Sequence, residues 1–113
     1  MSLPANIQSQ ARELLQLFCD ARVPERVRDQ VKLNFSFDGN SVTLSEERPK
    51  WNDPTKWISS KVAQFRYQPG TGTWVLFCRD QNGRWHEYFL PADADLGVLL
   101  KEVDRDPTGI FWG

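Results

Sequence analysis

Hydrophobic residues recur along the chain first at helical and then at strand spacing. Between residues 4 and 21 they fall three or four positions apart, which places them along one side of a helix. This stripe consists of Ile7, Ala11, Leu14, Leu15 and Phe18. Pro24 ends the helix, because proline has no N–H to donate. From Val31 every second residue is apolar, so residues 31–47 predict a hairpin that turns at Gly39.

Residues 48–57 interrupt the strand pattern. Pro49 and Pro54 argue against a central strand, because proline cannot donate to a ladder of hydrogen bonds. Trp51 and Trp57 argue against a purely solvated linker. We therefore predict an ordered loop that is pinned by its own aromatic side chains.

Three further strands and a helix follow. The strands are expected over residues 62–67, 73–79 and 84–90, with glycine-containing turns between them. Both faces of the last strand carry large side chains. Its inner face is therefore either the one with Trp85 and Phe89 or the one with Tyr88 and Leu90, and the sequence leaves both alternatives open.

The closing helix carries leucines at helical spacing and can be capped by Asp93 or Asp95. The predicted fold is therefore α+β: an N-terminal helix, a five-stranded antiparallel meander sheet and a C-terminal helix packed on the sheet. A length of 113 residues fits one domain, 1–113. The apolar tail Ile110-Phe111-Trp112 is expected to dock onto the sheet or a helix, because exposed it would form a sticky patch.

Composition restricts the function classes only slightly. The net charge of −1 argues against a domain that holds nucleic acid mainly by charge. There is neither a signal-peptide pattern nor an apolar stretch of roughly 20 residues, so we expect a cytoplasmic protein that does not enter a membrane. Cys19 and Cys78 are expected to be reduced, buried thiols. No cofactor is expected.

Several motifs resemble one bacterial family, which is catalogued as domain of unknown function 3024. The resemblance rests on Arg26 to Gln30, Glu46-x-Arg48-Pro49-x-Trp51, Ala63, Tyr67, Trp74, Trp85-His86-x-Tyr88 and Asp106-x-x-Gly109-x-Phe111-x-Gly113. It departs from the family pattern at Cys78, where the family more often has an aromatic residue, and at Trp112, where phenylalanine is more usual. The resemblance implies a compact, stand-alone bacterial protein and no assigned activity.

Catalytic chemistry has little support in the sequence. His86 is the single histidine, which is thin support for a metal site. If the turn before the last strand centres on Gln81 and Asn82, Cys78 lies opposite Trp85, and the Cys78 and His86 side chains point to opposite faces. This register opposes a Cys/His nucleophile, so we assign no catalytic residue and no metal ligand.

Basic and aromatic residues gather between residues 50 and 88 and provide the main functional signal. The candidate binding residues are Glu46, Arg48, Trp51, Trp57, Arg66, Tyr67, Arg84, Trp85, His86 and Tyr88. Exposed aromatics with arginine suit a protein-binding surface and also a sheet that stacks bases. Alternatively the aromatics are buried and the basic residues form a solvated strand face. The Glu46–Arg48 pair either lines a pocket or ties down a loop.

Three hypotheses follow, in order of preference. The first is a non-enzymatic interaction module that binds a protein partner and is itself a monomer or weak homodimer. The second is a single-stranded nucleic-acid binder. The third and weakest is a small enzyme with a pocket formed by Glu46, Arg48 and His86.

Overall fold

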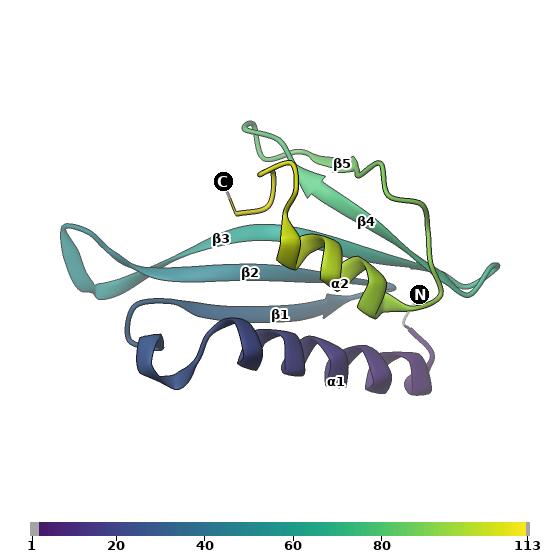
Figure 1. Ribbon diagram of the computed structural model, residues 1–113, viewed down its shortest axis with the longest axis horizontal. Helices are drawn as coiled ribbons and strands as arrows, with labels where there is room; N and C mark the ends of the chain where they lie inside the picture. The colour runs from purple at the N-terminus through teal and green to yellow at the C-terminus, as the bar shows by residue number, and fades with distance from the viewer. Residues whose placement is uncertain (1–2, 113) are drawn as a thin grey trace.

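The computed structural model describes residues 3–112 and contains two helices and five strands (Figure 1). The elements are α1 (Ala5–Arg22), the 3-10 turn η1 (Glu25–Val27), β1 (Lys32–Asp38), β2 (Ser41–Lys50), β3 (Asp53–Gln68), β4 (Thr73–Arg79), β5 (Trp85–Glu87) and α2 (Leu96–Arg105). Neighbouring strands are antiparallel and follow the order of the sequence, β1-β2-β3-β4-β5. The predicted α+β meander is confirmed.

Both helices pack on one face of the sheet, and the core lies between them and the strands (Figure 1). Alternate residues of the inner strands point into this core, as the period of two requires. Its largest fully buried side chains are Leu15, Val42, Leu44, Phe65, Leu76, Leu99 and Val103. Cys19 and Cys78 are buried and unpaired, as predicted, and burial raises the pKa of the Cys19 thiol to about 11. Neither described helix is long and apolar enough to cross a membrane.

The largest departure from the sequence prediction is at residues 48–57, which form strand and not loop. β2 continues to Lys50 and β3 already begins at Asp53, so the turn between them consists of Trp51 and Asn52. Pairing with β1 ends at Glu47 and pairing with β4 ends at Ala63. Beyond these points the hairpin has only two strands, and each has one open edge, where a proline costs no ladder bond.

We call this two-stranded extension, residues 48–61, the arm. It projects past the helices and past the other strands, along the 47 Å long axis of the molecule (Figure 1). A β-bulge lies at its base: Leu44 pairs with Ala63 and Ser45 with Lys61, so Val62 is an extra residue in β3. Bulges increase local twist and re-aim the strand that follows, which here is the arm.

The last strand is shorter than predicted and differs in register. β5 covers only Trp85–Glu87, and Cys78 lies opposite His86 instead of Trp85. The physical reason is the Asp80 carboxylate, which accepts the N–H groups of Asn82 and Arg84 and so enlarges the turn by one residue. Cys78 and His86 therefore lie on the same face of the sheet. Their side chains nevertheless do not bond to each other, because each has a different partner. The Cys78 thiol donates to the backbone carbonyl of His86, and the His86 ring bonds Asp80.

Candidate functional site

Trp51 occupies the tip of the arm and packs on very little of the molecule. Its side chain is 91% exposed, the highest value among the large hydrophobic residues that are exposed. The tip is ordered by polar contacts instead: Asp53 Oδ1 accepts from the hydroxyl of Thr55 at 2.6 Å and from its N–H at 3.3 Å. The prediction that this segment is pinned by its own aromatics is therefore wrong for Trp51.

Trp57 differs from Trp51, because it is half-buried on the arm. The Lys32 ammonium lies 4.2 Å from the centre of its ring, close enough for a cation–π interaction. Trp57 pairs with Pro49, whereas the next pair, Ile58 and Arg48, points to the helix side of the arm. Ile58 is 49% exposed, so the arm presents an apolar contact on this side as well.

A polar groove of about 380 Å³ lies at the base of the arm, on the helix side of the sheet. Its lining residues are Arg22, Val23, Val31, Leu33, Glu46, Arg48 and Asp104. Each guanidinium in the groove has a carboxylate of its own: Arg48 Nε lies 2.9 Å from Glu46 Oε1, and Arg22 Nη1 lies 2.7 Å from Asp104 Oδ1. The hydrogen bond and charge of Glu46 raise the pKa of Arg48. The charges of the groove are therefore balanced internally.

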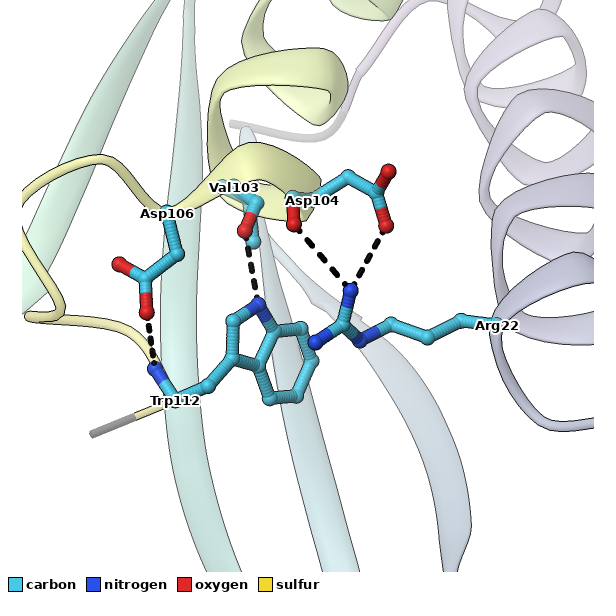
Figure 2. Close-up of polar contacts among 5 residues, drawn as sticks. All are labelled: Arg22, Val103, Asp104, Asp106 and Trp112. Carbon is cyan, nitrogen blue, oxygen red and sulfur yellow. Dashed lines mark hydrogen bonds and ion pairs between the residues drawn. The ribbon is translucent and has the colours of Figure 1, made fainter.

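The C-terminal segment fixes one side of this groove (Figure 2). The Trp112 indole N–H donates to the carbonyl of Val103 at 2.7 Å, and its ring lies 3.9 Å from the Arg22 guanidinium. The Asp106 carboxylate accepts the backbone N–H groups of Phe111 and Trp112, at 3.1 and 3.0 Å. The predicted docking of the tail is confirmed for these two residues, while Ile110 stays exposed.

Two of the predicted binding residues are part of the core. Tyr67 is buried against Trp74, with ring centres 5.1 Å apart. Tyr88 is buried and donates its hydroxyl to Glu102 Oε2 at 2.8 Å, and burial is the main reason that its pKa is raised. Neither phenol is therefore placed to meet a partner.

The sheet face opposite the helices carries two further arginine–aromatic contacts. The Arg66 guanidinium lies 3.7 Å from the centre of the Phe77 ring and is held there by Gln64 Oε1 at 2.7 Å. The Arg79 guanidinium lies 5.9 Å from the centre of the half-buried Trp85 ring. These rings already have an arginine of the same chain beside them, which leaves less of each ring for stacking a base.

His86 lies apart from the groove. Its ring is 2.6 Å from Asp80 Oδ2, in the turn that also carries the exposed Arg84. The N–H of Arg84 and the His86 ring, in that order, lower the pKa of Asp80. His86 is on β5, whereas Glu46 and Arg48 are on β2. Because β3 and β4 lie between these two strands, β5 and β2 are roughly 14 Å apart. The pocket of Glu46, Arg48 and His86 predicted for an enzyme does not form. Among residues 3–112 no three Asp, Glu, His or Cys side chains are grouped to hold a metal ion.

Sequence reasoning missed three residues of these surfaces. Arg22 and Asp104 are 82 positions apart, and no local pattern links them. Ile58 lies between the predicted loop, 48–57, and the strand predicted from residue 62, although alternation continued through both prolines would have placed it on a strand face.

Comparison with known proteins gives one match. No curated protein and no solved structure matches the chain. Residues 3–113 match the family model described as Domain of unknown function (DUF3024). Because the match covers nearly the whole sequence, this chain belongs to the DUF3024 family.

Proposed function

We propose that the chain is a non-enzymatic interaction module of the bacterial cytoplasm, and that the arm holds a protein partner with Trp51 as the anchor. The observation that carries this proposal is the exposure of Trp51, at 91%, on the tip of a projecting hairpin. Tryptophan is among the residues most enriched at the energetic centres of protein interfaces. At this position it adds little to the core, so its contact area is available to another molecule.

The surroundings of Trp51 suit the same role. Lys50 and Lys56 flank the tip, and Ile58 adds an exposed apolar side chain further along β3. Turn contacts of Asp53 hold the tip in shape before binding. A preordered anchor loses less conformational entropy on binding than a mobile one.

Single-stranded nucleic acid is the second candidate, favoured by the charge of the arm. The arm contains four basic residues and one acidic residue, together with two tryptophans. Against it stand the net charge of −1 and the arginines already placed beside Phe77 and Trp85. Base-stacking surfaces need free ring faces, so this candidate ranks second.

Replacing Trp51 by alanine is expected to abolish recovery of the partner in a pull-down from a lysate of the source organism. Loss of a tryptophan anchor costs about 2–4 kcal/mol of binding, or about 30-fold to 1,000-fold in Kd. The matched control is Phe89→Ala, which removes another exposed aromatic (73%) that lies outside the arm. We expect recovery by the wild type and by Phe89→Ala and none by Trp51→Ala.

Equal recovery by all three proteins would refute the role of the arm. A labelled single-stranded oligonucleotide, titrated at low and at high salt, separates the two candidates. Tight binding at low salt that is lost in Trp51→Ala would favour the second candidate over the first.

A further inference from the structure

The outer edge of β3 is open along the whole arm. β3 pairs with β4 only from Ala63 to Gln68, although the strand begins at Asp53. In the described chain no strand lies on the outer side of residues 53–62, and on the inner side β2 pairs with Asp53 and with residues 57–61, while residues 54–56 bulge out of the pairing. Along the regular part of this edge, residues 57–61, every second residue directs its backbone N–H and C=O away from the sheet. An open edge of this kind is a template for pairing with another chain.

We propose that this edge binds an extended, acidic segment of a partner protein by β-strand addition. The inference rests on the proposed function and deepens it, because it gives the arm a second mode of contact beside Trp51. Backbone pairing supplies affinity in this mode, and side chains at alternate positions supply specificity. The regularly paired part of this edge, residues 57–61, extends over roughly 16 Å, enough for a partner segment of about five residues.

Charge on the edge argues for an acidic partner. Lys56 and Lys61 are exposed β3 side chains, and the single acidic residue of the arm, Asp53, already lies 4.0 Å from Lys56 and accepts from Thr55. Cross-strand pairs of opposite charge are favourable and pairs of like charge are unfavourable. A glutamate- or aspartate-bearing strand therefore fits the edge, and a basic strand does not.

The same lysines argue against a second copy of this chain as the occupant. Two β3 strands that pair antiparallel about Ile58 or Ser59 gather the Lys56 and Lys61 side chains of both copies along one short seam, and the arm supplies only Asp53 to offset them. Pro54 also removes one backbone donor near the tip. Lysine and proline are the residues by which natural sheets discourage edge-to-edge association.

Side chains on the two faces of the arm offer contacts to an added strand. Ile58 is exposed on the helix side, and Trp57 lies next to it in sequence and so on the opposite face. An added strand with apolar residues between its acidic ones would place some of these residues beside Ile58 or Trp57. The fitting ligand class is therefore an alternating acidic and apolar segment.

A synthetic peptide titration followed by NMR tests the proposal. The probe is a blocked ten-residue peptide of alternating glutamate and valine, added to the isotope-labelled full-length chain. We expect shifts concentrated in the backbone amides of residues 55–61 and slower exchange of their outward N–H groups. A peptide of alternating glutamate and proline has the same charge and cannot form a strand, and one of lysine and valine has the opposite charge. Neither is expected to bind.

Charge reversal supplies the matched variants. Lys56→Glu with Lys61→Glu is expected to weaken binding of the glutamate–valine peptide about tenfold or more, while Lys101→Glu on α2 leaves it unchanged. Absence of binding, equal binding of the glutamate–proline peptide, or shifts confined to the outer edge of β1 would overturn the proposal. These outcomes leave the Trp51 pull-down unaffected, so failure of strand addition is distinguishable from failure of the proposed function.

Discussion

Deletion of residues 110–113 is expected to lower the free energy of unfolding by roughly 3–5 kcal/mol, the usual cost of removing a buried aromatic side chain. Phe111 is 7% exposed, and its ring centre lies 5.0 Å from that of Tyr88. Trp112 contributes its indole hydrogen bond and its contact with Arg22. Domains are stable by only about 5–15 kcal/mol, so the thermal midpoint should fall by about 10 °C or more.

The control for the deletion is Ile110→Ala, in the same tail. Ile110 is exposed, and its replacement should change the stability by no more than about 0.5 kcal/mol. If the deleted chain melts at the wild-type midpoint, the docked tail is not part of the fold. In that case the tail becomes the better candidate for a partner-binding peptide.

Replacement of Asp106 by alanine is expected to cost roughly 2–4 kcal/mol, because the carboxylate accepts two backbone N–H groups and such charge-assisted bonds contribute about 1.5–3 kcal/mol each. Asp106 ends α2 in the left-handed region, at φ 45°, which Asp and Asn tolerate better than alanine. Asp106→Asn retains one acceptor oxygen and this tolerance, so it should lose less. Urea unfolding of the three proteins measures the difference.

The two variants should not be additive. The donors that Asp106 binds belong to Phe111 and Trp112, so deletion of the tail removes them. Asp106→Ala should therefore cost much less in the deleted chain than in the full-length chain, a coupling that a double-mutant cycle reports. If Asp106→Ala lowers the free energy of unfolding equally in the full-length and the deleted chain, Asp106 stabilises the protein only by ending α2 and not through the tail.

Periodicity was sufficient for most of the fold. The leucine spacing of α2, the alternation of β1 and the glycine-containing turns all gave the correct element types. The arm was missed because the two prolines were judged by the rule for central strands. Pro49 and Pro54 lie where β2 and β3 each have an open edge, and only the pairing limits at Glu47 and Ala63 show this.

Prediction of the candidate site was less complete, for physical reasons. Glu46 and Arg48 lie two positions apart on one strand, so their pairing could be anticipated from the sequence. The Arg22–Asp104 pair depends on how α1 and α2 meet, and the sequence alone does not fix this contact. Whether an aromatic residue is exposed also depends on contacts with residues distant in the sequence. Trp51 is exposed and Tyr67 is buried, although both lie in or beside long strands.

Amide hydrogen exchange of the chain with and without its recovered partner tests the central claim most directly, because it reports which backbone the partner covers. We predict slower exchange over residues 53–61 of the arm, with little change in α1 and α2. Unchanged exchange in the arm, together with protection of the helices or of the sheet face that carries Arg66 and Phe77, would contradict the account.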